Sequence, residues 1–470
     1  MTSKRVLSRL KSESGEVLKE LLDLPLDVNV SQLQRMCNAL LNQDEGIPYL
    51  FFVNDREISD TLEKTLATGD YSSEQVLEIV YQQQAVFKVR PVTRCTSSLP
   101  GHAESVLTVR FSPDSKHLAS GSGDTTVRLW DLDTQTPLLS LTGHKNWVLC
   151  LEWSPDSSKI ASGDKNGHII VWTPEGRQLG KTLISHKQWI TSLCWEPYHM
   201  NPECRLLASG SKDGDIRIWD VLQGQTVRIL SSHTKSVTCI KWGGSGLLYS
   251  SSQDRTVKVW RVSDGVLCRT LEGHAHWVNT LALSTEWVIK TGPLDPLRAE
   301  EVNTNSSKED LKALAQRRYE SVFGNGERLV SGSDDFTLFL WSPESDKKPI
   351  ARLTGHQQLV NDVKFSPDGR LIASASFDKS IKLWESKTGR FVGVLRGHVQ
   401  AVYVISWSAD SRLLVSGSAD STLKVWNVQN RKLEVELPGH ADEIYAVDWS
   451  SNGLQVASGG KDKLVRLWQN

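Results

Sequence analysis

The feature that most constrains this chain is a repeat of about 42 residues, marked by one histidine and one tryptophan in every unit. Eight of the twelve histidines stand in Gly-His or Ser-His dipeptides, with separations of 42, 42, 47, 41, 82, 42 and 42 residues. A short insertion therefore follows the third histidine, and a long one follows the fifth. The histidines are His102, His144, His186, His233, His274, His356, His398 and His440. The tryptophans that end the units are Trp130, Trp172, Trp219, Trp260, Trp341, Trp384, Trp426 and Trp468.

Each unit also carries the pattern of short antiparallel strands. The residues before the closing tryptophan alternate between apolar and polar, as in VRLW and IKLW, and turn sequences such as SPDG (366–369) interrupt them. An acidic residue precedes the tryptophan by six positions in seven units, and Asn166 takes that position in the second unit. These acids are Asp124, Asp213, Asp254, Asp335, Asp378, Asp420 and Asp462. The sequence therefore predicts eight four-stranded units.

The repeated polar residues predict a buried hydrogen-bond network. A buried tryptophan ring needs an acceptor for its N–H group. In the first unit, Ser120 can accept from the ring of Trp130, and His102 can link the serine hydroxyl to Asp124. Serine, histidine and aspartate also form catalytic triads, but eight copies at one period favour a structural network over catalysis.

Composition argues against several classes of function. A net charge of −1 gives no whole-chain basis for nucleic-acid binding, and no apolar stretch approaches the roughly 18 residues of a membrane span. Seven cysteines without a Cys-x-x-Cys pair disfavour a disulfide framework or a zinc finger. The glycines of EGRQLGKT (175–182) are too close together for a phosphate loop. We therefore expect a protein that is not an enzyme and has no small-molecule substrate, no cofactor of its own and no membrane partner.

Taken together, these units resemble the WD-repeat β-propeller family over about residues 93–470. Only two units keep a literal Trp-Asp, at Trp130–Asp131 and Trp219–Asp220. The chain stops two residues after Trp468, so the last blade needs an outer strand from elsewhere, and residues 93–99 are expected to supply it. Such pairing would close a ring of eight blades and leave no exposed sheet edge.

Residues 1–92 form a different segment, without the repeat and without tryptophan. The sequence predicts strands at 6–10, 17–21, 49–54 and 76–81, a helix at 31–42 that begins at Ser31, and a helical turn at 60–66. This order indicates a small α+β, ubiquitin-like (β-grasp) domain. The alternative is a simple αβ cap on the propeller.

The order of a ubiquitin-like domain and an all-β, eight-bladed propeller resembles the Notchless family. Matching strings include VFKVRPVTRCTSSLPGH (86–102), CWEPYHMNPECR (194–205), HAHWVNTLALST (274–285) and SDDFTLFLWSP (333–343). The resemblance implies a ribosome-assembly factor that binds precursors of the large ribosomal subunit in the nucleolus and nucleoplasm. It also implies that the AAA ATPase Midasin grips the ubiquitin-like domain and pulls on it to remodel the particle.

The same resemblance implies that Glu74 completes the coordination shell of a divalent cation, expected to be Mg²⁺, held by the adhesion site of Midasin. Glu74 lies in a turn-rich stretch, and a hard cation prefers a carboxylate oxygen. Asp70 and Tyr71 in the same loop are further candidates for partner binding. The alternatives are that Glu74 is a solvated loop residue, or that another acid of this segment serves: Glu78, Glu57 or Asp55.

Two parts of the propeller are candidates for binding the particle. Trp147, Trp189 and Trp277 each follow a repeat histidine by three residues, and they either fill wedges between blades or form exposed docking aromatics. Lysines in the connecting loops could meet rRNA phosphates: Lys145, Lys187, Lys212, Lys235 and Lys461. The insertion at 286–327 in the fifth repeat is either a flexible loop or a docking helix. That helix would begin at Ser307, have Asp310 three residues on, and turn Arg317 and Arg318 outward.

Two other functions compete with ribosome assembly. Substrate receptors of cullin-type ubiquitin ligases often carry Trp-Asp, any residue, then Arg, but Trp130–Asp131 continues with Leu132–Asp133 and Trp219–Asp220 with Val221–Leu222. A signalling adaptor that acts on Notch pathway components could use the same ring. Nuclear residence follows from the resemblance alone, because no run of five basic residues marks an import signal.

Overall fold

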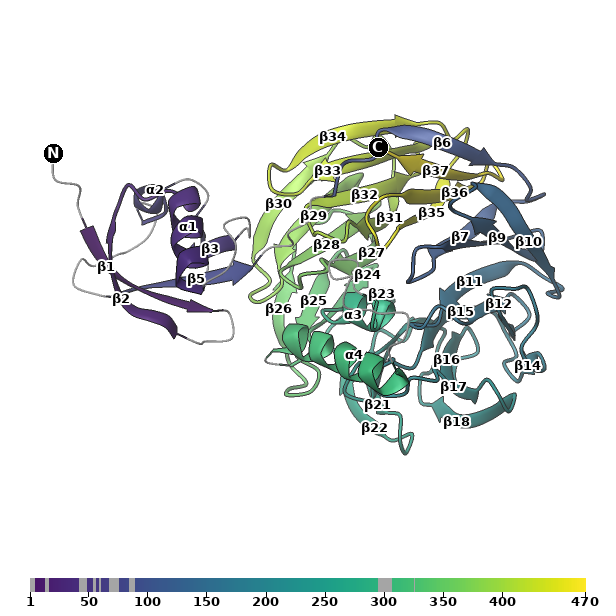
Figure 1. Ribbon diagram of the computed structural model, residues 1–470. Helices are drawn as coiled ribbons and strands as arrows, with labels where there is room; N and C mark the ends of the chain where they lie inside the picture. The colour runs from purple at the N-terminus through teal and green to yellow at the C-terminus, as the bar shows by residue number, and fades with distance from the viewer. Residues whose placement is uncertain are drawn as a thin grey trace. The chain divides into compact units, whose positions relative to one another are not determined.

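The computed structural model describes residues 5–12, 17–41, 49–53, 56–58, 61–66, 76–83, 89–294, 307–324 and 326–470. The chain divides into two units, Met1–Lys88 and Val89–Asn470, slightly before the boundary at residue 92 that the sequence suggested. Figure 1 draws the first unit in purple, and the second unit runs from blue to yellow.

The first unit has a mixed five-stranded sheet in the order β2-β1-β5-β3-β4, with β1 parallel to β5. Leu33 and Cys37 of the long helix are buried in one core with Leu10, Phe51 and Ile79 of the sheet. This topology with its own core is that of a β-grasp domain, as predicted. Its described elements are β1 (Arg5–Ser12), β2 (Val17–Pro25), α1 (Val30–Leu41), β3 (Tyr49–Val53), β4 (Arg56–Glu57), α2 (Leu62–Leu66) and β5 (Leu77–Gln83).

Helix α1 begins slightly before the predicted start. The side chain of Asn29 accepts a hydrogen bond from the backbone N–H of Gln32 at 2.9 Å, and the Gln32 side chain accepts one from Asn29 N–H at 3.1 Å. This reciprocal pair satisfies two N–H groups that a helix start leaves unpaired. The expectation that Ser31 caps the helix is therefore wrong, since Ser31 already lies inside it.

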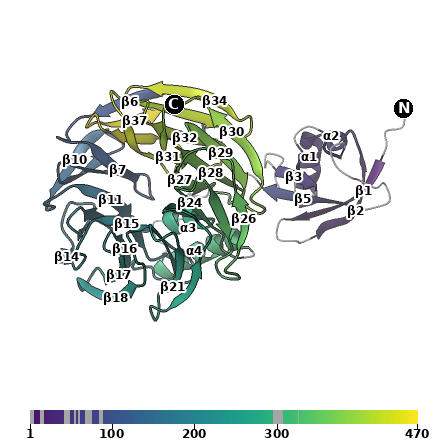
Figure 2. The same cartoon turned by 180° about the vertical axis from the view of Figure 1, so that it is seen from behind.

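The second unit consists of eight antiparallel four-stranded sheets around a common axis (Figures 1 and 2), as predicted. The innermost strands of blades 1 to 8 are β7 (Val106–Phe111), β11 (Val148–Trp153), β15 (Ile190–Trp195), β19 (Val237–Trp242), β23 (Val278–Leu283), β27 (Val360–Phe365), β31 (Val402–Trp407) and β35 (Ile444–Trp449). The second strands are β8 (His117–Ser122), β12 (Ile160–Asp164), β16 (Leu206–Ser211), β20 (Leu247–Ser252), β24 (Leu329–Ser333), β28 (Leu371–Ser376), β32 (Leu413–Ser418) and β36 (Val456–Gly460). The third strands are β9 (Thr126–Asp131), β13 (His168–Trp172), β17 (Asp215–Asp220), β21 (Val257–Arg261), β25 (Leu338–Trp341), β29 (Ser380–Glu385), β33 (Thr422–Asn427) and β37 (Val465–Gln469). The outer strands are β10 (Thr136–Thr142), β14 (Leu183–Ile184), β18 (Gln225–Ser231), β22 (Leu267–Leu271), β26 (Pro349–Leu353), β30 (Phe391–Arg396), β34 (Lys432–Pro438) and, in blade 8, β6 (Arg94–Leu99).

The ring closes through β6, as the sequence predicted. This strand pairs antiparallel with β37, with Leu99 opposite Val465 and Arg94 opposite Gln469. Innermost strands of neighbouring blades contact one another around the whole ring, including β35 of blade 8 with β7 of blade 1. The first strand of the propeller therefore stabilises the last blade, which gives the ring no free edge at its seam.

The eight closing tryptophans lie in the cores between and within blades. All eight are at most 3% exposed, and those of blades 1 to 7 pack with the aliphatic side chains of their own or a neighbouring blade. Truncating a buried tryptophan typically costs roughly 3–5 kcal/mol, so these residues are major determinants of propeller stability.

In its described residues, the insertion in blade 5, between β23 and β24, carries the helices α3 (Glu286–Thr291) and α4 (Lys308–Phe323). Ser307 accepts from Asp310 N–H, and the Asp310 carboxylate accepts from Ser307 N–H, which forms the predicted capping box. Ala315 and Tyr319 of α4 are buried against the propeller, so the segment is a docked helix. Across the described parts of the chain, no helix has the length and apolar character needed to cross a bilayer.

Candidate functional site

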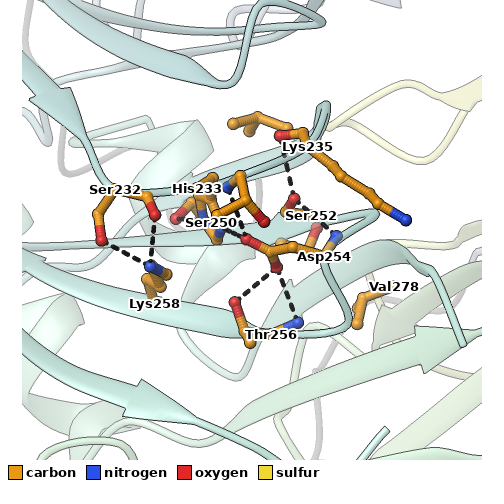
Figure 3. A network of polar contacts seen from close by, with 12 residues as sticks. Ser232, His233, Lys235, Ser250, Ser252, Asp254, Thr256, Lys258 and Val278 are labelled. Carbon is orange, nitrogen blue, oxygen red and sulfur yellow. Dashed lines mark hydrogen bonds and ion pairs between the residues drawn. The ribbon is translucent and has the colours of Figure 1, made fainter. Parts of the chain in front are cut away.

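Blade 4 shows the repeated polar network in detail (Figure 3). The ring N–H of Trp260 donates to Ser250 Oγ at 2.9 Å, and Ser250 Oγ lies 2.8 Å from His233 Nε2. His233 Nδ1 lies 2.6 Å from the carboxylate of Asp254, which also accepts from the hydroxyl and the backbone N–H of Thr256. The network thus ties the third strand, the second strand and both adjoining loops together.

The same three contacts occur in all eight blades, which confirms the predicted network. The tryptophan to serine distances are 2.8–2.9 Å, the serine to histidine distances are 2.7–2.8 Å, and the histidine to aspartate distances are 2.6–3.1 Å. The serines are Ser120, Ser162, Ser209, Ser250, Ser331, Ser374, Ser416 and Ser458.

Blade 2 reaches the same network with a different aspartate. Asn166 occupies the usual acidic position, but its side chain is exposed and bonds to Asn146. Asp164, two residues earlier, is fully buried and lies 3.1 Å from His144 Nδ1. Asp164 does not fit the repeat pattern in the sequence, because it stands where the other blades have a serine or glycine. A search for any acid within the turn would have found it.

The protonation states of the network follow from burial. Burial lowers the pKa of His233, so the imidazole is neutral, whereas hydrogen bonds lower the pKa of Asp254 despite its burial. His233 therefore donates from Nδ1 to the carboxylate and accepts at Nε2 from the hydroxyl of Ser250. Because Ser250 is buried and its oxygen already accepts from the tryptophan ring, this geometry suits a structural role.

The loops before the first strand and between the second and third strands lie at one end of every blade, which we call the histidine face. Trp147, Trp189 and Trp277 stand on this face and are 47%, 39% and 40% exposed, so the interpretation that they fill wedges between blades is wrong. Lys165 Nζ lies 4.2 Å from the ring centre of Trp147 and 4.8 Å from that of Trp189. Lys212 Nζ lies 4.3 Å from Trp189, so cations and rings alternate across blades 2 and 3.

Helix α3 lies at the opposite end of the blades, close to the middle of the ring (Figures 1 and 2). Its Glu286 is 2.5 Å from Lys241 of β19 and 3.6 Å from Lys364 of β27, and its Lys290 is 3.3 Å from Asp448 of β35. Burial alone would raise the pKa of Glu286, but the two lysines lower it to about 2. Ion pairs to three innermost strands therefore hold α3 across the ring axis. No pattern in the sequence indicates this contact.

Helix α4 turns one arginine inward. Arg318 donates to the carbonyl groups of Gly292 and Leu294 and to the hydroxyl of Thr291, whereas Arg317 is exposed. The expectation of an outward arginine pair is therefore wrong for Arg318. On the helical spacing, Arg318 lies three residues after Ala315, on the face that packs against the propeller.

Glu327 is a further residue that sequence reasoning missed. Its fully buried carboxylate accepts hydrogen bonds from Gly244 N–H at 2.7 Å, Thr285 Oγ1 at 2.8 Å, Tyr249 Oη at 3.0 Å and Tyr319 Oη at 3.2 Å. These donors come from blade 4, from the residue before α3 and from α4. One carboxylate thus joins the two ends of the insertion to each other and to blade 4.

The candidates in the first unit fall largely outside the described residues. Asp70, Tyr71 and Glu74 lie within 67–75, which the structure does not describe. Glu78 lies on β5 and pairs with Lys11 at 2.6 Å, which commits this alternative carboxylate to an ion pair. Within the described ranges, no three histidine, cysteine or acidic side chains are grouped to hold a metal ion.

This architecture defines a WD-repeat propeller protein with an N-terminal β-grasp domain. The sequence matches the WD domain, G-beta repeat family over residues 93–131, 135–173, 177–220, 224–261, 347–385, 389–427 and 431–469, and the NLE (NUC135) domain family over residues 6–66. The insertion-bearing blade 5 is not among the seven matched repeats, but its sheet is complete. A solved structure, the computationally designed Ika8 protein, is 28% identical with a TM-score of 0.63, over 80% of this chain and all of that chain.

Three relatives matched over most of their length sharpen the assignment. Protein Notchless of Drosophila melanogaster is 57% identical over 79% of this chain and 76% of its own. The Notchless protein homolog of Arabidopsis thaliana is 53% identical over 84% and 82%, and ribosome assembly protein 4 of Saccharomyces cerevisiae is 48% identical over 81% and 77%. The chain belongs to the Notchless family of WD-repeat proteins.

Proposed function

We propose that this protein is a non-enzymatic assembly factor for the large ribosomal subunit, acting in the nucleolus and nucleoplasm. The observation that carries the proposal is the similarity, over about four fifths of the chain, to proteins named ribosome assembly protein 4 in Saccharomyces cerevisiae and Chaetomium thermophilum. The propeller is the anchor on the pre-ribosomal particle, and the β-grasp domain is the handle that Midasin grips.

In this proposal, Midasin binds the β-grasp domain through a cation that both proteins coordinate. The Midasin adhesion site holds a divalent cation, and Glu74 supplies a carboxylate oxygen to its open coordination position. A hard cation favours such a ligand, and one ligand from this chain is enough when the partner provides the others. The ion pair of Glu78 with Lys11 supports the choice of Glu74, because one of the three alternative carboxylates is already engaged.

The anchor needs an exposed surface with affinity for protein or rRNA. The histidine face supplies exposed tryptophans and lysines in the loops of blades 2 and 3. Helix α4 supplies the exposed Arg317 at the other end of the blades. Loops that a rigid scaffold holds in place are common binding surfaces.

The test distinguishes Midasin binding by the β-grasp domain from particle binding by the propeller. Glu74→Ala and Glu74→Asp should abolish binding of the isolated Midasin adhesion domain in a pull-down with Mg²⁺. The tagged variants should still sediment with large-subunit precursors. Glu63→Ala, which removes an exposed glutamate from α2, is the matched control and should bind normally. Unchanged binding by both Glu74 variants would refute the handle, and wild-type protein absent from the precursor fractions would refute the whole proposal.

A regulatory role in Notch signalling is a second candidate, favoured by the name of the Drosophila relative. An adaptor of that kind would be found with Notch pathway components and not with pre-ribosomes. The cullin-receptor alternative has less support, because neither Trp-Asp pair is followed by the arginine that such receptors carry.

A further inference from the structure

We propose that the loops of blades 2 to 4 on the histidine face form a binding platform for single-stranded RNA, with Trp147 and Trp189 stacking on bases. The inference deepens the proposed anchoring role and rests on it for its setting in the cell. RNA affinity itself is measurable on the isolated protein.

The first observation is the alternation of rings and cations. Lys165 lies between Trp147 and Trp189, and Lys212 lies beyond Trp189, at 4.2–4.8 Å from the ring centres. These ring contacts hold the lysines in place while both tryptophans keep more than a third of their surface exposed. Exposed rings that alternate with cations suit single-stranded nucleic acid, since bases stack on aromatic faces and phosphates meet the ammonium groups.

The second observation is the charge of the surrounding loops. The loops at 145–147, 165–167, 187–189, 212–214, 234–236 and 253–255 contain six basic residues and two acids. The acids, Asp213 and Asp254, are hydrogen-bonded to His186 and His233 and nearly buried. Figure 3 shows the Lys235 side chain extending away from the blade 4 network. The surface of this sector is therefore positive although the whole chain is nearly neutral.

The rest of the face differs. The loops before the first strands of blades 8 and 1 contain Asp442, Glu443 and Glu104. Trp277 of blade 5 is as exposed as Trp189, but its neighbour His276 pairs with Asp334 at 3.4 Å. Both requirements for single-stranded RNA, an exposed ring and nearby cations, are thus met together at blades 2 and 3, and the blade 4 loops extend the positive surface. An acidic protein would use the lysines but would not need the two exposed rings.

The experiment measures binding of the full chain to a fluorescently labelled 12-nucleotide oligo(U) RNA by anisotropy at several salt concentrations. Trp147→Ala and Trp189→Ala should each weaken binding roughly 5- to 150-fold, as expected for loss of one stacked base. Trp277→Ala is the matched control and should change affinity less than twofold. The double variant Lys165→Gln, Lys212→Gln should lower the slope of log affinity against log salt by about 1.4, at about 0.7 per phosphate contact.

Three results would overturn the inference. One is an absence of RNA binding by the wild-type chain while it still sediments with large-subunit precursors, which would leave the proposed function standing. Another is equal affinity for duplex RNA with no effect of the tryptophan substitutions, which would exclude base stacking. The third is loss of a protein partner from precursors in the Trp147 and Trp189 variants without any change in RNA affinity, which would make this sector a protein interface.

Discussion

Replacing Glu327 by alanine tests whether one buried carboxylate fastens the blade 5 insertion to the propeller. The substitution removes the acceptor for four donors, from Gly244, Tyr249, Thr285 and Tyr319. A buried donor without a partner costs roughly 1–3 kcal/mol. The three hydroxyl groups can turn towards other acceptors or water, whereas the Gly244 N–H cannot, so we expect a net loss of about 3 kcal/mol and not the sum of four terms.

The assay is hydrogen exchange of α4, because local opening reports on this contact without requiring two-state unfolding of the whole chain. A loss of about 3 kcal/mol accelerates exchange in Lys308–Phe323 by roughly 150-fold, while exchange in blades 1 and 7 should be unaffected. Glu320→Ala is the control, because Glu320 is an exposed residue of the same helix whose hydrogen bond, from Gln316, lies within that helix. Equal exchange of α4 in Glu327→Ala and Glu320→Ala would refute the reasoning.

The pH dependence of α4 protection provides a second test of the contacts that Glu327 makes. Burial raises the pKa of Glu327, although hydrogen bonds from Gly244, Thr285 and Tyr249 oppose the shift. A carboxyl group with a raised folded-state pKa contributes stability that is complete below the unfolded pKa of about 4.3 and is lost as the pH rises through the folded pKa. The protection of α4 in wild type, divided by that in Glu327→Gln at each pH, should therefore fall as the pH rises. A ratio that rises with pH would contradict the assignment.

Two further predictions concern the propeller. Asp164→Asn should destabilise blade 2 by roughly 1–3 kcal/mol, because His144 loses a charged acceptor, whereas Asn166→Ala should cost less than about 0.5 kcal/mol. Thermal unfolding followed by tryptophan fluorescence compares the two variants. Equal effects would exclude Asp164 as the acid of the blade 2 network. Glu286→Gln should remove on the order of 2–3 kcal/mol of stability that α3 gains from its two lysine pairs. Because the pKa of Glu286 is lowered to about 2, the wild type should lose this stability only as the pH falls from about 4.5 towards 2. A stability difference between wild type and variant that persists at pH 2 would exclude the ion pairs as its cause.

Repetition explains how much of the fold was predictable. Eight copies of one histidine-to-tryptophan pattern indicated eight blades, and β6 as the closing strand followed from the position of the last tryptophan. The capping box at Ser307 and Asp310 was predictable because it involves residues close in sequence. By contrast, the two-residue strand β4 is too short to leave a pattern, and the Asn29 cap precedes the apolar run that suggested Ser31.

The sequence by itself determined the blade count, the closure and the polar network apart from its acid in blade 2, because each of these depends on local periodicity and on partners that recur from unit to unit. Only the tertiary structure decided what depends on neighbours from distant segments. Trp147 and Trp189 are exposed beside lysines, Arg318 turns inward, and Glu327 and Glu286 bind the insertion to blades that precede and follow it. The physical reason is that the exposure and the partners of a side chain depend on which strands and loops of other blades lie beside it in the ring. The residue pattern within one strand contains no information about those neighbours.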